Sequence, residues 1–148
     1  MLLAGCATTP TSETTADHQL ERAQIEQRLN QIFDAAEKKD FGRLESYHLY
    51  GPAFTKFAPE SPTRMDAAAA RKGERDGLQA VSDLTMKAND LEIDVFGNTR
   101  IATFMFDYGF KAGTNTVQKQ ALATLVFVKE AGEWKITHEH FSPSSIGQ

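Results

Sequence analysis

Two histidines, His138 and His140, are the residues whose type and spacing most suggest chemistry in this chain of 148 residues. They lie in residues 132–143, a stretch in which Trp134 and Ile136 alternate with mainly polar residues. Side chains alternate between the two faces of a β-strand, so this pattern places the tryptophan, the isoleucine and both histidines on one face. Because the first two are large and apolar, we expect the face to be covered and the histidines to be at least half-buried.

Such a histidine pair could bind a metal ion or transfer protons. Histidines two positions apart on a strand can coordinate zinc or iron when a third ligand is present, and the candidates are His48 and Asp107. Histidine is also the commonest general base, so His138 beside Tyr108 is the candidate catalytic residue. We favour a third interpretation, in which both histidines are hydrogen-bonded residues of a pocket wall. It implies no metal site and no cofactor, because no supporting carboxylate or nucleophile is evident beside them.

The composition is that of an ordinary globular domain, with 41% apolar and 24% charged residues. The chain is long enough for one domain with one hydrophobic core. A formal net charge of −4 argues against nucleic acid as a partner, because such proteins usually carry a basic patch. No apolar run is long enough to span a bilayer, and a single cysteine excludes both an internal disulfide and a multi-cysteine metal site.

That cysteine, Cys6, ends the tetrapeptide Leu-Ala-Gly-Cys at residues 3–6, which resembles the lipobox of bacterial lipoprotein signal peptides. The polar residues that follow have the composition of a tether. A signal peptide also needs a basic segment and an apolar run before its cleavage site, so the resemblance predicts further coding sequence before Met1. It implies that residues 1–16 are a signal-peptide remnant with a polar tether. The protein would then be in the cell envelope, on the periplasmic side and attached to the membrane only through the lipid; otherwise it would be soluble.

Apolar residues at helical spacing dominate the first half of residues 17–148, the expected folded domain. The stripe from Ile25 to Ala36 predicts a long first helix. A short helix should follow Asp40, and two more are expected from Asp66 to about Gly73 and around Leu84. Residues 53–57 are a candidate short strand. From residue 91 the apolar period changes from 3.6 to 2, and Gly- and Asn-containing turns then divide the chain into four strands. Helices followed by an antiparallel meander predict an α+β fold.

The predicted turns at residues 113–115 and 130–132 set the register of the last strands. This register collects aromatic and polar residues on one face, and we predict that they bind a small apolar or aromatic ligand: Phe104, Phe106, Tyr108, Thr124, His138 and His140. The alternative is that the aromatic residues simply fill the core. The other face carries Leu125 and Phe127, which need cover although the helices are already committed elsewhere. We therefore expect a homodimer through this outer face.

The C-terminal pattern, preceded by helices, resembles the SnoaL-like branch of the nuclear transport factor 2 (NTF2-like) superfamily. The residues that carry the resemblance are Gly132, Trp134, Ile136, His138, His140 and Ser142. It implies a cone in which the N-terminal helices pack on the concave face of a curved antiparallel sheet, often with dimerisation through the outer face.

This superfold hosts isomerases, cyclases, dehydratases, binding modules and oligomerisation domains, so it does not fix a function. Ketosteroid isomerase chemistry needs a carboxylate base and an oxyanion hole. The corresponding positions of this chain fall near Phe33, Phe57 and Thr124, none of which is charged. We therefore expect a SnoaL-like small-molecule-binding domain without identified catalytic machinery. The alternatives are a ketosteroid-isomerase-like, cyclase or dehydratase enzyme that uses a pocket histidine, and a dimerisation module with a filled core.

Overall fold

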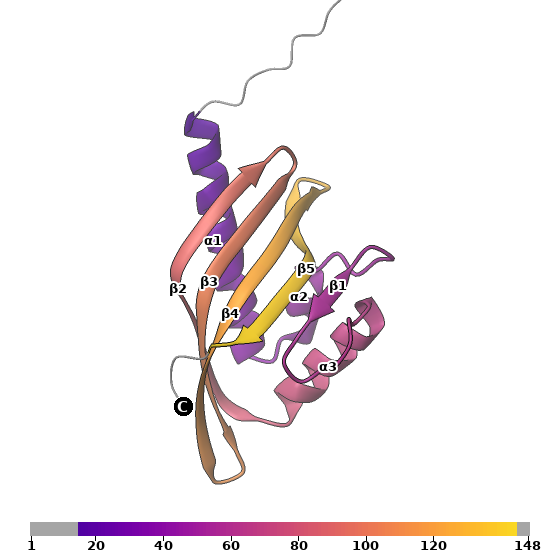
Figure 1. Cartoon of the computed structure of the whole chain (residues 1–148), viewed down its shortest axis with the longest axis vertical. Helices are drawn as coiled ribbons and strands as arrows, with labels where there is room; N and C mark the ends of the chain where they lie inside the picture. The colour runs from indigo at the N-terminus through magenta and orange to yellow at the C-terminus, as the bar shows by residue number, and fades with distance from the viewer. Residues whose placement is uncertain (1–14, 145–148) are drawn as a thin grey trace, which may run out of the picture.

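The structure, a computed structural model, describes residues 15–144 as three helices and one five-stranded sheet (Figure 1). The elements are α1 (Thr15–Glu37), α2 (Phe41–Ser46), β1 (Thr55–Phe57), α3 (Ala67–Gln79), β2 (Ser82–Phe96), β3 (Thr99–Ala112), β4 (Asn115–Glu130) and β5 (Glu133–Pro143). Among these described residues, no helix has the length and apolar character that crossing a membrane would require.

The strand order is β1-β5-β4-β3-β2, with β1 parallel to β5 and every other neighbouring pair antiparallel. The sheet is curved and α1 runs along one of its faces, while α2 and α3 lie beside β1 and β5 (Figure 1). This arrangement confirms the predicted α+β fold with helices on the concave face. The short strand expected at residues 53–57 is β1. It adds a fifth strand that runs parallel to β5, so the sheet is mixed rather than purely antiparallel.

The long helix α1 buries the predicted apolar stripe, including Ile25, Leu29 and Phe33. The Phe33 ring stacks on Phe106 at 5.5 Å and meets Phe104 edge-on at 6.2 Å. Aromatic pairs of this kind contribute roughly 0.5–1.5 kcal/mol beyond the burial of their area. These three rings therefore fasten α1 to the sheet and fill the space between them.

The short helices begin at predicted caps, but their boundaries differ from the prediction. The side chain of Asp66 accepts a hydrogen bond from Ala69 N at 2.9 Å, and α3 then continues unbroken to residue 79. Leu84, expected on a further helix, lies in β2, which begins nine residues before the predicted strand. Leu84, Met86 and Ala88 are half-buried and alternate with exposed residues, as in a strand. In so short a segment, apolar residues alone do not distinguish a helix from a strand.

Each hairpin turn has two residues, at positions 97–98, 113–114 and 131–132. The first was predicted as such, but the other two are one residue shorter than expected, with Ala112 opposite Asn115 and Glu130 opposite Glu133. A shift of one residue moves every side chain of a strand to the opposite face. Because the turn at 113–114 is one residue shorter, each β4 side chain lies on the opposite face of the sheet from the one predicted.

This reversal corrects the predicted dimer contact. Leu125 and Phe127 face the concave side and are only 2% and 0% exposed, so they belong to the core. The outer face instead carries Leu122, which is 49% exposed, and Phe57 of β1, which is 43% exposed. The outer face therefore carries exposed apolar residues, but not the two that were predicted.

A β-bulge reverses the alternation within β5. Before it, Ile136 pairs with Phe127 and is buried on the concave side; after it, His138 pairs with Val126. Thr137 is the extra residue between these two pairs, and an extra residue exchanges the faces of everything that follows. Both histidines, His138 and His140, consequently lie on the outer face, opposite to the prediction.

Candidate functional site

Charged side chains gather on the concave face beside the bulge. His48, Lys56 and Glu139 are each no more than 9% exposed. Glu139 enters from β5, and Lys56 lies directly opposite it in the parallel register of β1. His48 follows α2 and pairs with Ile136 in an isolated bridge at the same edge of β5. Together with Glu74 of α3, these three residues form what we call the concave cluster.

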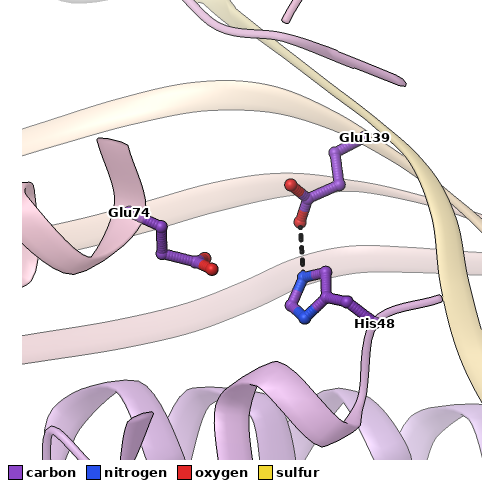
Figure 2. Close-up of side chains that lie close together, drawn as sticks. All are labelled: His48, Glu74 and Glu139. Atoms are coloured by element: carbon purple, nitrogen blue, oxygen red, sulfur yellow. Dashed lines mark hydrogen bonds and ion pairs between the residues drawn. The ribbon is translucent and has the colours of Figure 1, made fainter. Parts of the chain in front are cut away.

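Glu139 is the centre of the cluster. Its Oε1 lies 3.2 Å from His48 Nε2 (Figure 2), and its Oε2 lies 2.9 Å from Lys56 Nζ. The second ring nitrogen of His48, Nδ1, lies 2.9 Å from the carbonyl oxygen of Leu44. Because a carbonyl and a carboxylate can only accept hydrogen bonds, this geometry suits an imidazolium that donates from both nitrogens.

The pKa shifts agree with this arrangement. Burial by itself lowers the pKa of His48, but the hydrogen bond and the charge of Glu139 outweigh it and raise that pKa above its usual value. Burial alone would raise the pKa of Glu139, yet the Lys56 charge and the His48 hydrogen bond hold it far below its usual range. The pKa of Lys56 is raised, since the charge of Glu139 outweighs the effect of burial. Glu139 and Lys56 are therefore charged at neutral pH, and the contacts of His48 favour its charged form.

Glu74 is the half-exposed member of the concave cluster. Its carboxylate extends from α3 toward His48 and Glu139, and one ligand atom from each of the three lies within 4.8 Å of the others (Figure 2). The hydroxyl of Tyr50 donates to Glu74 Oε2 at 3.2 Å, and its ring stacks on His48 at 4.9 Å. Burial and the charge of Glu74 raise the pKa of Tyr50. Since Glu74 and Tyr50 are only half-buried, the cluster opens to solvent beside α3.

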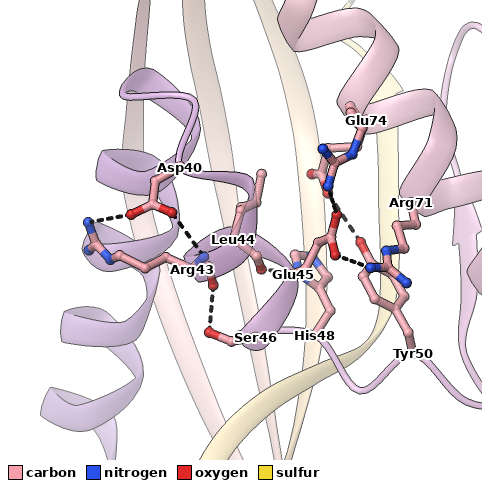
Figure 3. A network of polar contacts seen from close by, with 10 residues as sticks. Asp40, Arg43, Leu44, Glu45, Ser46, His48, Tyr50, Arg71 and Glu74 are labelled. Carbon is pink, nitrogen blue, oxygen red and sulfur yellow. Dashed lines mark hydrogen bonds and ion pairs between the residues drawn. The ribbon is translucent and has the colours of Figure 1, made fainter.

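Ion pairs between α2 and α3 hold Glu74 in place. Glu45 of α2 binds the guanidinium groups of Arg71 and Arg75 of α3. Figure 3 shows its contact with Arg71. Arg75 also lies 4.6 Å from the centre of the Phe41 ring. These contacts fix the position of α3 along α2, and with it the position of the Glu74 side chain.

An aromatic strip continues along the concave face from the cluster: Phe141, Phe106, Tyr108 and Phe110. The Phe141 ring lies 5.3 Å from Lys56 Nζ and 5.6 Å from Phe106. Tyr108 stacks on Phe106 at 5.0 Å and on Phe110 at 6.4 Å. Tyr108 and Phe141 are half-exposed, so part of the strip faces solvent. The pKa of Tyr108 is raised by burial and by the charge of Glu60.

Two hollows of the described surface lie away from the concave cluster. One of about 370 Å³ lies between α1 and β2, and one of about 180 Å³ lies between α1 and the β4–β5 turn. The larger is lined by Gln19, Arg22, Ala23, Glu26, Leu91 and Ile93. Neither hollow contains a residue predicted to bind ligand.

The predicted ligand-binding residues divide between the two faces. The aromatic members lie on the concave face as predicted, where Phe104 and Phe106 fill the core and Tyr108 is half-exposed. Thr124, paired with His140, lies on the outer face. The sequence therefore placed six residues in one cavity that the fold separates into two groups.

His138, the candidate catalytic residue, lies on the outer face rather than in the cone. Its Nδ1 is 2.7 Å from Thr55 Oγ1. Burial and the charge of His140 lower its pKa. The Phe57 ring lies 6.2 Å from His138 and 5.6 Å from His140, so these groups form an imidazole–aromatic patch on the outer face.

The candidate third metal ligands also separate. Asp107 lies on the outer face, as predicted, and accepts hydrogen bonds from Asn89 at 2.6 Å and Gln120 at 2.7 Å. His48 lies in the concave cluster instead. Cys6, the predicted lipidation site, lies outside the described residues.

The sequence interpretation missed Lys56, Glu74 and Glu139. Glu139 sits between the two histidines, and simple alternation assigned it to the polar face. Only the bulge at Thr137 turns it inward. Lys56 is the only charged residue in the short strand of residues 53–57. A lone charge in such a strand is the one feature of the sequence that could have suggested a buried carboxylate opposite it.

Comparison with known proteins identifies the fold. The profile of the SnoaL-like domain matches residues 25–145. A search of curated proteins finds no match. Solved structures that resemble the chain include an NTF2-like family protein of Streptomyces avermitilis named as a candidate dehydratase, with a TM-score of 0.78, 18% identity, and 86% of this chain and 98% of that chain covered.

Two further structures show how varied these relatives are. A nuclear transport factor 2 superfamily protein of Salmonella enterica has a TM-score of 0.77 and 18% identity, with 88% of this chain and 96% of that chain covered. The CaMKII hub of S. rosetta has a TM-score of 0.70 and 23% identity, with 82% and 95% covered. At these identities the similarity establishes the NTF2-like fold and leaves the function open.

Proposed function

This chain belongs to the SnoaL-like family, and we propose that it is a small-molecule-binding domain whose ligand contacts the concave cluster. One observation carries the proposal: a buried carboxylate, imidazole and ammonium lie on the concave face and reach solvent through Glu74 and Tyr50. Apolar residues of similar size would usually stabilise a fold as well as buried ions do. A charged cluster that opens to solvent is therefore a candidate binding site.

The surroundings suggest the chemistry of the ligand. Glu74 offers carboxylate oxygens, so it favours a hydrogen-bond donor such as an amine or a hydroxyl. The half-exposed rings of Tyr108 and Phe141 lie next to Lys56 and Phe106 along the aromatic strip, and they suit a flat apolar body. Together they favour a small aromatic compound that carries a donor group.

The protonation states support binding rather than proton transfer. A general base needs a pKa near the working pH and a free acceptor atom. Both ring nitrogens of His48 are engaged, the pKa of Glu139 is far too low, and the pKa of Lys56 is too high. His138 lies on the other face. The alternative of an enzyme with a pocket histidine therefore lacks support from this geometry.

Chemical-shift mapping by NMR tests the proposal. Benzylamine, benzyl alcohol and benzoate should be titrated into the ¹⁵N-labelled protein in the presence of a metal chelator. Benzylamine should perturb residues around Glu74 and Tyr108, and benzoate should bind more weakly because Glu74 is anionic. Glu74→Gln should weaken benzylamine binding by about 10- to 100-fold, as expected for one hydrogen bond to a charged group. Absence of perturbations around the cluster, or perturbations confined to the outer face, would refute it.

A second role, self-association through the outer face, is favoured by a separate observation. Leu122 and Phe57 are exposed there, and Val126 and Met105 are only half-buried. Exposed apolar residues on one face of a sheet favour an interaction site there. Among the structurally similar proteins are a CaMKII hub and an association domain. We propose a homodimer that pairs these two outer faces.

Analytical ultracentrifugation tests this second role. The protein should sediment as a dimer at micromolar concentration, and Phe57→Ser should raise the dimer dissociation constant at least tenfold. A protein that remains monomeric at several hundred micromolar would contradict it.

We also propose that the domain is anchored to a membrane through a lipid on Cys6, on the periplasmic side of the cell envelope. The support is the lipobox-like tetrapeptide and the polar tract behind it. Expressed in a Gram-negative host with its upstream coding sequence, the protein should fractionate with membranes, and Cys6→Ser should become soluble. A wild type that stays soluble with an unprocessed N-terminus would exclude the anchor.

A further inference from the structure

Three residues of the concave cluster have the composition of a metal site. His48, Glu74 and Glu139 each offer one ligand atom, and these atoms lie within 4.8 Å of one another. In a four-coordinate zinc site with bonds of about 2.0–2.2 Å, two ligand atoms lie roughly 3.5 Å apart. His48 Nε2 and Glu139 Oε1 are 3.2 Å apart and already come close to this spacing. A movement of about 1–1.5 Å by the half-buried Glu74 side chain would bring the third ligand into range.

We propose that the concave cluster binds one divalent metal ion, best suited to Zn²⁺, through His48 Nε2 and one carboxylate oxygen each from Glu74 and Glu139. One imidazole and two carboxylates are ligands that zinc accepts, and a water molecule would complete a four-coordinate site. This differs from the sequence prediction of no metal, which considered His48 only as a partner of the outer-face histidines.

The buried carboxylate of Glu139 has coordinating capacity beyond its present contacts. Its Oε1 lies 3.2 Å from His48 Nε2, and its Oε2 pairs with the Lys56 ammonium at 2.9 Å. A carboxylate can accept about four hydrogen bonds, so these two contacts leave oxygen lone pairs that a cation could bind.

The surrounding hydrogen bonds are those of metal sites. His48 Nδ1 lies 2.9 Å from Leu44 O, and a ring N–H donated to a backbone carbonyl directs the other nitrogen toward a metal. Tyr50 donates to Glu74 Oε2, which orients that carboxylate. Both contacts orient ligand side chains from outside the site.

Metal and proton would compete for the same nitrogen. His48 Nε2 lies 3.2 Å from Glu139 Oε1, so a proton on this nitrogen is donated to the carboxylate. Binding of Zn²⁺ must displace that proton, and the Lys56 charge opposes a second cation nearby. We therefore expect about one proton to be released per ion and the affinity to rise with pH.

Isothermal titration calorimetry of the chelator-treated full chain with Zn²⁺ tests the site, with Co²⁺ absorption as a probe of geometry. We expect one ion per chain, proton release seen as a buffer-dependent heat, and a Co²⁺ spectrum typical of four-coordination. Loss of an outer-shell contact typically weakens metal binding 10- to 100-fold, so Glu74→Gln, which removes a ligand, should weaken it at least about 100-fold. His140→Gln, an exposed histidine of the outer face, is the matched control and should leave the affinity unchanged. No binding, or equal binding by Glu74→Gln, would overturn the proposal.

Lys56→Met separates a metal site from a purely structural ion cluster. The variant leaves Glu139 buried without its ammonium partner, so the metal-free protein should be less stable. If the cluster binds Zn²⁺, the ion should restore much of the lost thermal stability and bind more tightly than to wild type. A variant that is destabilised and gains nothing from Zn²⁺ would overturn the proposal.

Metal binding by the concave cluster does not depend on the proposed organic ligand. The NMR titration is carried out with a chelator, and the calorimetry contains no organic ligand. Failure of either experiment therefore leaves the other result interpretable.

Discussion

Adjacent residues of β5 face two very different environments. Glu139 points to the concave side, where His48 and Lys56 neutralise its charge away from water. Its neighbours His138 and His140 point to the outer face, where Thr55 and solvent surround them. The histidines are the residue types that suggest chemistry, yet the buried carboxylate between them is the member of the candidate site. Burial and partners, rather than residue type, distinguish the two faces.

The largest effect should come from placing the same charge on each face of β4. Leu125→Glu puts a carboxylate in the core, where an unpaired charge should cost at least about 4 kcal/mol, a large part of the stability of a typical domain. Circular dichroism and urea titration should show a largely unfolded or severely destabilised protein. Leu122→Glu should instead change the unfolding free energy by no more than about 0.5 kcal/mol and convert the dimer to monomer in sedimentation. Equal behaviour of the two variants would show that the assigned faces are wrong.

The second comparison removes a polar group from each face of β5. Glu139→Gln leaves Lys56 and His48 without their counterion, and breaking a buried ion pair in this way costs about 3–5 kcal/mol. His140→Gln, on the exposed side, should change the unfolding free energy by less than about 0.5 kcal/mol. Urea denaturation measures both. A loss below 1 kcal/mol for Glu139→Gln would indicate that the cluster is hydrated rather than buried.

The pH dependence of stability should report the concave cluster. The pKa of Glu139 is lowered in the fold, so its contribution is present above about pH 4.5 and is lost as pH falls below that value. The pKa of His48 is raised, so its contribution is complete below about pH 6.5 and is lost as pH rises through the folded-state pKa.

Urea titrations between pH 3.5 and pH 9 measure both limits, with slopes of at most about 1.4 kcal/mol per pH unit for one proton. His48→Gln should remove the alkaline decline and keep the acid one. An alkaline decline that persists in this variant would assign it to another group.

The smallest effect should come from the outer-face hydrogen bond between Thr55 and His138. Thr55→Val keeps the shape and β-propensity of the side chain but removes the hydroxyl. A single net hydrogen bond contributes about 0.5–1.5 kcal/mol, and partial exposure should keep the loss at the lower end. Thermal denaturation measures it, and a loss above about 2 kcal/mol would indicate that this pair is far more buried than the structure shows.

Local patterns predicted the elements that depend on local physics. The apolar stripe around Ile25 and Leu29 gave α1, because one helical face must be buried. The Gly97–Asn98 turn gave the first hairpin, since a two-residue turn favours residues that tolerate positive φ. The change of period near residue 91 separated helices from strands, although β2 begins earlier.

The candidate site was not predictable in the same way. Its residues come from α2, β1, α3 and β5, and the side that each faces depends on register. A turn shorter by one residue at 113–114 moved Leu125 into the core, and the bulge at Thr137 exchanged Glu139 with the histidines. Both choices are made by the packing of whole faces, which outweighs local preferences at single residues.

By itself, the sequence determined the fold class, the helical half and the strand half, because burial patterns repeat along each element. Only the tertiary structure decided that Glu139 meets His48 and Lys56. These residues are up to 91 positions apart, and a buried carboxylate is tolerated only where other segments bring compensating charges to it. No pattern along one strand contains that information.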